Sequence, residues 1–306
     1  MSERRPWWQI LLALVLLALV ASYLYRHRAA LSDLPPLAAS VWLLAFLITA
    51  AGTGSSVCAV QDVLAAVGAR TRWGEMFLLH NAAYLLNFLP AKPGTVLRAT
   101  YLRSHYEFSF ARFGVFALFL TLLTTLVTAA VGLASLLAVY GLERTADRLF
   151  AALLAACIAA TLVLLFAPLP VPAWEGRLGG LLRELLASRR ALLGAPLTLL
   201  RPTVWLLVVY LLGALRLGVI YAGFGLDAHP GGLLLLGALG QLSMLASLTP
   251  GALGVRELLV GGGAVVLGVP VEAGLLAALI ERAVGLAWSV VVGVPSALWV
   301  WRRQAR

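Results

Sequence analysis

Charged residues are scarce in this 306-residue chain, at 12% of the total, whereas hydrophobic residues make up 62%. Soluble domains carry about 25% charged residues, so this sequence does not supply enough polar surface for a soluble protein with a large core. Apolar runs of roughly 18 residues or more recur along the chain, and each is long enough to cross a bilayer. The composition therefore excludes a soluble globular domain and predicts an all-α polytopic membrane protein.

Cysteine and histidine are also rare. The two cysteines, Cys58 and Cys157, lie in apolar segments without metal-type spacing, and we interpret them as small core residues. The four histidines are scattered, and the sequence has neither a His-Glu-x-x-His motif nor a Gly-x-x-x-x-Gly-Lys nucleotide loop. We therefore expect no metal site, no cofactor and no enzymatic activity.

Acidic residues are outnumbered, with 23 Lys and Arg against 13 Asp and Glu and a net charge of +10. In a soluble protein this excess would suggest nucleic acid, but the chain has no basic domain interleaved with aromatic residues. Cytoplasmic loops of membrane proteins accumulate Lys and Arg, and such loops also attract anionic headgroups. We therefore expect membrane lipids as partners, with anionic headgroups, and no nucleic acid.

Six apolar segments are long enough to span the membrane. Their ranges are 7–25, 37–60, 113–140, 148–167, 203–224 and 276–300. Two further apolar segments, 73–103 and 232–268, are interrupted near their middles by Pro and Gly, and each arm is then too short to cross. Such a broken helix can enter and leave on one side, and it is tolerated only where protein or a wet cavity surrounds it. The pattern predicts two re-entrant hairpins.

The distribution of positive charge sets the orientation. If 73–103 enters from the cytoplasm and 232–268 from outside, both termini are cytoplasmic. Sixteen Lys and Arg then lie on the cytoplasmic side, and the outer side keeps Arg26, Arg28, Arg144 and Arg148. Eight full spans would give the same parity. Re-entrance is favoured because a true crossing would carry Lys92 and Arg98 to the wrong side. The prediction is a multi-pass protein of the cell membrane.

The two interrupted segments share a pattern of a proline, a glycine four residues on and an arginine beyond. These residues are Pro90, Gly94 and Arg98 in the first break, and Pro250, Gly254 and Arg256 in the second. The flanking units, 37–140 and 203–300, would run in opposite directions, as in the inverted-topology repeats of transporters. Segment 141–202 would link them by one span and a cytoplasmic amphipathic stretch, so that 1–306 forms a single transmembrane domain.

The breaks also suit an anionic ligand. Helix ends expose unpaired N–H groups and a positive dipole end, which attract phosphate. A cation inside a membrane costs at least about 2.5 kcal/mol at a helix centre, so it needs a partner or a function. For Arg256 the partner is either Glu257 or Glu281, and Lys92 either serves the site or snorkels to the cytoplasm. His80, within a hairpin arm, is interpreted as a satisfied internal group.

For the other polar residues, hydrogen bonds between helices are the alternative role. The candidate substrate-binding residues are Asn87, Lys92, Gly94, Arg98, Arg216, Gln241, Gly254, Arg256, Glu257, Glu281 and Arg282. The candidate helix-break residues are Pro90, Pro93, Pro250 and Gly251.

Two stretches carry a resemblance to a known family. "NFLPAKPGTVLRATYLRSHYEFSFARF" and "SLTPGALGVRELLVGGGAVVLGVPVEAGLLAALIERAVG" are similar to the signature regions of the lysylphosphatidylglycerol synthase transmembrane-region, or flippase-like, family. The second is matched at Pro250, Gly251, Gly254, Arg256 and Glu257. The first stretch keeps Pro90, Gly94 and Arg98. Thr95 stands where many family members carry Glu. Few residues follow the last span, so we expect a stand-alone member without the soluble synthase domain.

The resemblance implies a protein that moves lipids between leaflets. We therefore expect a flippase for a phosphate-bearing lipid, either an anionic phospholipid or a polyprenyl-phosphate-linked carrier. Two alternatives remain open, an intramembrane lipid-modifying enzyme and a non-transporting assembly partner of an enzyme in a lipid or glycan pathway.

Overall fold

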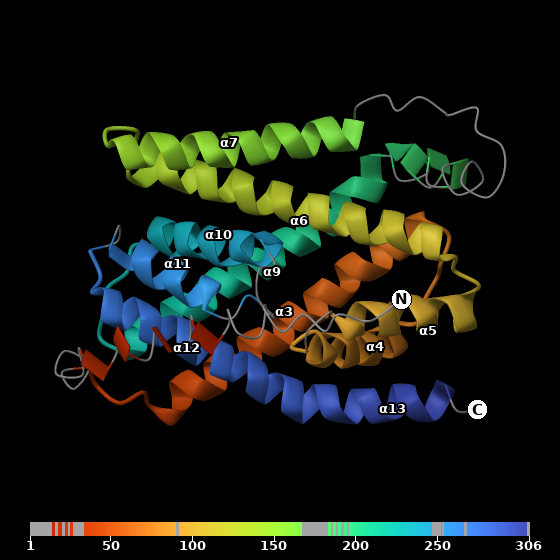
Figure 1. Cartoon of the computed structure of the whole chain (residues 1–306), viewed down its shortest axis with the longest axis horizontal. Coiled ribbons are helices and arrows are strands. Elements are labelled where there is room, and N and C mark those ends of the chain that lie inside the picture. The colour runs from red at the N-terminus through yellow and green to blue at the C-terminus, as the bar shows by residue number, and fades with distance from the viewer. Residues whose placement is uncertain are drawn as a thin grey trace.

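The computed structural model describes residues 34–89, 92–166, 196–246, 254–265 and 268–304, together with Ala252 and several residue pairs within 14–26 and 183–194. These residues form a bundle of helices, with no strand among them (Figure 1). The predicted all-α class is confirmed.

The helices differ greatly in length, from 10 residues in α11 to 30 in α6. In chain order they are α3 (Ala39–Ala66), α4 (Trp73–Leu86), α5 (Pro93–Tyr106), α6 (Phe110–Val139), α7 (Thr145–Phe166), α9 (Pro196–Gly223), α10 (Pro230–Ala246), α11 (Val255–Ala264), α12 (Val271–Trp288) and α13 (Val294–Gln304), with the π-helix η3 (Ser289–Gly293) joining the last two.

Within the described residues, five helices are long and apolar enough to cross a membrane. They are α3, α6, α7, α9 and the continuous unit 271–304 that α12, η3 and α13 form. They coincide with five of the six predicted spans, so the polytopic prediction is confirmed. The other predicted span, 7–25, and most of the predicted amphipathic stretch lie outside the described residues.

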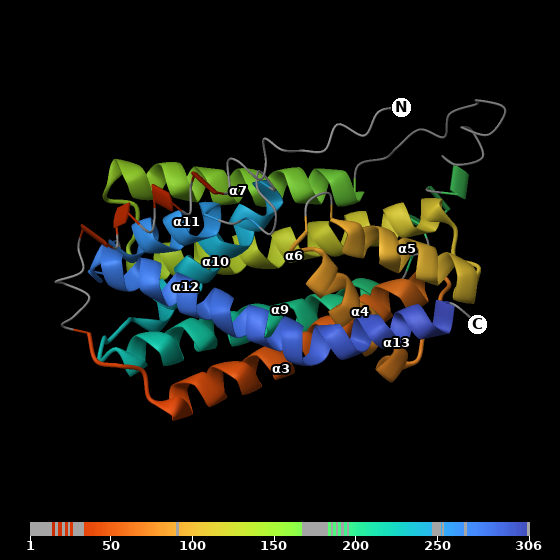
Figure 2. The ribbon, with the colours of Figure 1, turned by 60° about the horizontal axis from the view of Figure 1, so that its bottom comes forward.

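The two interrupted segments form helical hairpins. The arms α4 and α5 have 14 residues each, about 21 Å of helix against a hydrocarbon core of about 30 Å. Both lie in the half of the bundle near the C-terminus, whereas α10 and α11 lie in the opposite half (Figures 1 and 2). The described arms of each hairpin therefore end near the middle of the bundle (Figure 1), where the sequence has its breaks.

The long helices of the first and second predicted units run through the bundle in opposite directions. Helix α3 and the unit 271–304 run toward the end that holds the C-terminus, and α6 and α9 run away from it (Figure 1). Helices α3 and α9 pack along each other, α4 packs on α13, and α10 packs on α6. Each hairpin thus packs against the last helix of the other unit, which is the pairing expected of an inverted repeat. The repeat boundaries, 37–140 and 203–300, stay a prediction.

The first hairpin closes tightly because of one glycine. A Cβ added to Gly94 would lie 1.9 Å from the backbone oxygen of Ala83, so any side chain there would separate α4 from α5. Lys92 precedes α5 in the left-handed conformation, with φ 49°, and Pro93 occupies the first helical position, where its missing N–H costs nothing. Of the predicted break residues, Pro93 is thus at a helix start, while Pro90, Pro250 and Gly251 lie outside the described residues.

The second hairpin has a different start to its outgoing arm. Gly254 precedes α11 with φ 80°, a conformation that favours glycine. Its N–H donates to Glu257 Oε2 at 2.7 Å, and Glu257 lies in the first turn, where the helix dipole favours a negative charge. Glycine and glutamate therefore fix the beginning of α11 together.

Candidate functional site

A cavity of about 520 Å³ lies where the two hairpins meet. Its wall draws on α3, α9 and α12 as well as on both hairpins. The first hairpin contributes Asn87 and Lys92 at its turn, and the second contributes Gln241 and Arg256. At the turn of the first hairpin, Asn87 Oδ1 accepts a hydrogen bond from Thr95 N at 3.1 Å, which caps the start of α5. The interruptions in the sequence therefore contribute part of the cavity wall, beside three long helices.

Seven of the eleven predicted binding residues line the cavity, and four do not. The seven are Asn87, Lys92, Arg216, Gln241, Arg256, Glu281 and Arg282. The remaining four are Gly94, Arg98, Gly254 and Glu257. The two glycines shape the backbone at the breaks, and Arg98 and Glu257 each contact a side chain of the cavity wall.

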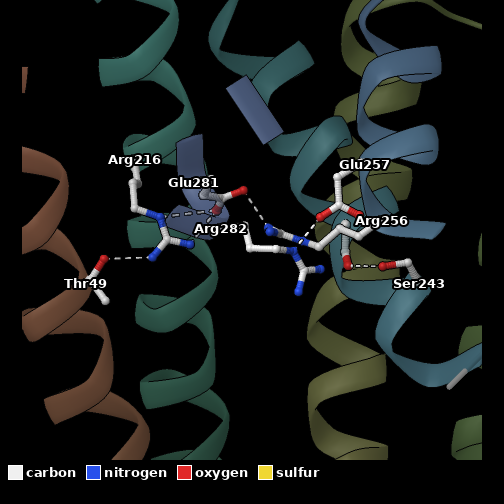
Figure 3. A network of polar contacts seen from close by, with 8 residues as sticks. Thr49, Arg216, Ser243, Arg256, Glu257, Glu281 and Arg282 are labelled. Atoms are coloured by element: carbon white, nitrogen blue, oxygen red, sulfur yellow. Dashed lines mark hydrogen bonds and ion pairs between the residues drawn. The ribbon is translucent and has the colours of Figure 1, made fainter. Parts of the chain in front are cut away.

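Glu281 is the centre of a buried ionic network (Figure 3). Its side chain is 1% exposed, and its Oε2 accepts from Arg256 Nη2 at 2.6 Å. Its Oε1 pairs with Arg216, whose Nε lies 3.2 Å away. Arg216 also donates from Nη1 to Thr49 Oγ1 at 2.9 Å. One carboxylate thus joins α9, α11 and α12, and Arg216 extends the network to α3.

A second ion pair joins Glu257 of α11 to Arg282 of α12 (Figure 3). Glu257 is fully buried. The open choice for Arg256 is thereby resolved, because its partner is Glu281 and not the adjacent Glu257. Neighbouring helical residues point about 100° apart, and accordingly Glu281 and Arg282 bond to different partners.

The charges around the cavity do not cancel. Among the described residues that line it, the cations are Lys92, Arg216, Arg256 and Arg282. The carboxylates that oppose them are Glu281 in the wall and Glu257 behind Arg282. Among the described residues at the cavity, four cations thus stand against two carboxylates. Coulomb energies grow as the local dielectric falls, so charges in such a cavity interact more strongly than charges on a surface patch.

Arg98 adds a further cation one layer behind the wall. Its Nη2 lies 3.3 Å from Nδ1 of His80, which lines the cavity. Arginine is only a donor, so His80 Nδ1 accepts and Nε2 carries the ring proton of a neutral imidazole. Arg98 Nε is buried without a hydrogen-bond partner in the described part of the chain. Arg98 therefore orients a cavity-lining donor rather than facing the cavity itself.

Sequence reasoning missed His80 and the hydroxyl groups of α3. Thr49, Thr53 and Ser56 line the cavity at the spacing of one helical face. The stretch "TAAGTGSS" carried this signal, because several polar residues there recur inside an apolar span. The interpretation of His80 as an internal group holds in part: it bonds Arg98, but it also lines the cavity.

No group of three or more His, Cys, Asp or Glu residues with metal-binding geometry occurs among the described residues. The polar groups that face the cavity include guanidinium, ammonium and amide donors, whereas the hydroxyls of Thr49 and Thr53 already donate to backbone oxygens of α3. Such a set binds phosphate or carboxylate oxygens, and arginine does so with a planar fork of N–H groups.

Fold and site together define a polytopic α-helical membrane protein with a cation-rich internal cavity between two hairpins. A family model described as the lysylphosphatidylglycerol synthase TM region matches residues 6–293, and the chain belongs to that family. The family is a membrane domain associated with lipid flippase function, generally the non-catalytic part. No individually curated protein matches the chain.

Proposed function

We propose that this protein moves a phosphate-bearing lipid, an anionic phospholipid or a polyprenyl-phosphate-linked lipid, from one leaflet of the cell membrane to the other. The observation that carries the proposal is the majority of cations over carboxylates among the described residues at a cavity that both hairpins line. A phosphate placed there would meet Arg256 from one hairpin and Lys92 from the other. Its negative charge would complement a wall in which the described cations outnumber the carboxylates.

Glu281 would compete reversibly with the ligand for contacts to Arg216 and Arg256. Arg256 and Arg216 are held by this one carboxylate in the described structure. A phosphate group presents three or more oxygens, so it can take over contacts to either arginine while Glu281 keeps the other. Binding would then weaken the link between α11 and α9, and release would restore it. This exchange of partners suits the rocking of one repeat against the other.

The orientation follows from the arginines at the two ends of the bundle. The segments that meet at the end near the C-terminus are the α3–α4 loop, the end of α5, the start of α6 and the end of α13 (Figure 1). They contain Arg70, Arg72, Arg103, Arg112, Arg302 and Arg303. The opposite end, between α6 and α7, has Arg144 and Arg148 together with Glu143 and Asp147. Because positive loops stay in the cytoplasm, we infer that the C-terminal end is cytoplasmic. The first hairpin would then enter from the cytoplasm and the second from outside.

The test is leaflet exchange in proteoliposomes. Purified protein is reconstituted with fluorescent phosphatidylglycerol, phosphatidylethanolamine or a short-chain polyprenyl phosphate, and dithionite quenching reports the fraction of probe in the outer leaflet. We expect exchange of an anionic lipid, and we expect Arg256→Gln to slow it at least tenfold. Arg302→Gln, an exposed arginine of α13, is the matched control and should leave the rate unchanged.

Two outcomes would overturn the proposal. One is the absence of exchange of any of the three lipids by folded protein, with or without an imposed proton gradient. That result would favour an assembly role beside a lipid- or glycan-pathway enzyme. The other is equal slowing by Arg256→Gln and Arg302→Gln, which would mean that the cavity charge does not select the substrate.

A further inference from the structure

A second, smaller cavity of about 190 Å³ lies between α6 and α10. Helix α6 lines it with Leu120, Thr121, Thr124, Thr125 and Thr128, and α10 lines it with Gln241 and Leu242. We call this cavity the threonine groove. Gln241 lines both it and the main cavity. The two spaces are therefore neighbours, with one amide side chain at their boundary.

The threonine groove is less polar than its sequence suggests. The hydroxyls of Thr121, Thr124 and Thr125 each donate to a backbone oxygen four residues earlier, at 2.8, 2.7 and 2.9 Å. These donors are therefore already used inside α6. What the threonines offer to an occupant is mainly their methyl groups, next to two leucines. The wall suits hydrocarbon better than a headgroup.

The position of the groove matches this chemistry. Its lining on α6 spans residues 120–128, in the middle third of a helix that runs from Phe110 to Val139. That is the depth at which lipid chains lie in a membrane whose core α6 crosses. A headgroup held in the main cavity lies at a similar depth, between the hairpin turns, so its chains need a lateral way out to the bilayer.

We propose that the threonine groove holds a hydrocarbon chain of the lipid whose headgroup occupies the main cavity, with Gln241 at the junction between headgroup and chain. The inference rests on the proposed function, and it adds the path along which the chain stays in contact with the bilayer. Because Gln241 lines both cavities and the wall of the threonine groove is largely apolar, a lipid chain is the occupant that fits. A helix from a second copy of the protein is the competing occupant.

The first experiment locates the chain directly. Phosphatidylglycerol with a diazirine near the middle of one acyl chain is reconstituted with the full-length protein, irradiated and analysed by peptide mass spectrometry. We expect cross-links within 120–128 and at Gln241 or Leu242. Chain cross-links spread evenly over the outer faces of the helices, or cross-links between two protein copies through the groove, would overturn the inference.

The second experiment separates the groove from the headgroup site. Thr125→Trp fills the groove, and Leu137→Trp, on an exposed part of the same helix outside the groove, is the matched control. We expect Thr125→Trp to slow exchange of long-chain phosphatidylglycerol at least tenfold. Binding of glycerol phosphate, which has no chain, should remain unchanged when measured by calorimetry in detergent. Leu137→Trp should change neither.

A third variant guards against a simple folding defect. Thr125→Val keeps the shape of the side chain and removes a hydroxyl that already bonds within α6. We expect it to fold and to exchange lipid at the wild-type rate, and a severe loss would contradict an apolar groove. If wild-type protein exchanges no lipid but the chain still cross-links to 120–128, the proposed function fails while the groove stands. Normal exchange by Thr125→Trp would refute the groove alone.

Discussion

The turns of the two hairpins face one cavity but are stabilised in different ways. At the second turn, Arg256 and the nearby Arg282 each pair with a buried carboxylate. At the first, Arg98 contacts the neutral imidazole of His80, and the residue at position 95, which lines the cavity, is a threonine. The two hairpins thus hold their positive charge in different ways. Arg256 of the second hairpin is paired with a carboxylate, whereas Arg98 of the first lies behind the neutral side chain of His80.

This difference assigns the two turns different roles. Removing one partner of a buried ion pair is costly, because it leaves an uncompensated charge. The second turn should therefore be sensitive to substitution through stability. The first turn has no described ion pair between Arg98 and a carboxylate, so substitution there should affect the ligand more than the fold. The following predictions test this contrast, from the largest expected effect to the smallest.

Glu281→Gln should have the largest effect on stability. It removes the charge that holds both Arg216 and Arg256, and loss of a buried partner typically costs about 3–5 kcal/mol. We expect a clear drop in the melting temperature in detergent, together with loss of lipid exchange. The double variant Glu281→Gln/Arg216→Gln should recover part of the lost stability, and a melting temperature equal to wild type in the single variant would show that the network contributes little.

Gly94→Ala should be the next most damaging change, because the added Cβ would overlap the backbone oxygen of Ala83. Overpacking typically costs about 1–3 kcal/mol, and a rigid carbonyl leaves little room to relax. Gly74→Ala is the control, since a Cβ at this α4 glycine meets no atom within 4 Å. Equal thermal stability of the two variants would mean that α4 and α5 do not pack closely in the membrane.

Arg98→Gln should separate function from stability. We expect the free energy of unfolding to change by only about 1 kcal/mol, and the melting temperature to change little, because no buried ion pair is broken. Lipid exchange should fall roughly tenfold, because His80 loses the hydrogen bond that orients it at the cavity wall. His80→Gln, which keeps a side-chain donor, should reduce exchange less than Arg98→Gln. A large loss of stability in Arg98→Gln with unchanged exchange per folded molecule would reverse the assignment of roles.

Thr49→Val should have the smallest effect. It removes the hydroxyl that accepts from Arg216 at 2.9 Å while Glu281 still holds that arginine. The expected destabilisation is about 1 kcal/mol, the usual contribution of one hydrogen bond. Calorimetric melting in detergent would detect it. A loss as large as that of Glu281→Gln would place Thr49, rather than the carboxylate, at the centre of the network.

The sequence predicted the spans and hairpins because both depend on local properties. An apolar run such as 113–140 reports its own length, and Pro93 and Gly94 mark a helix start wherever the chain folds. Charge pairing is not local in this sense. Glu281 bonds Arg216, 65 residues earlier, and this requires knowing that α9 and α12 are neighbours. His80 was underestimated for the same reason, since its cavity contact depends on how α4 packs against α3.

The π-helix at Ser289–Gly293 sets the direction of the side chains that follow it. It inserts an extra residue into one turn, which rotates every later side chain by about 100° relative to an uninterrupted α-helix. Before it, Trp288 lines the cavity and donates to Asn81 Oδ1 at 2.7 Å; after it, Arg303 reaches Glu75 at 3.2 Å. Both contacts anchor the same hairpin arm, α4. Deleting one residue from this stretch would let it become a regular α-helix while Arg303 keeps its direction toward Glu75, whereas straightening the π-turn without a deletion would turn Arg303 away.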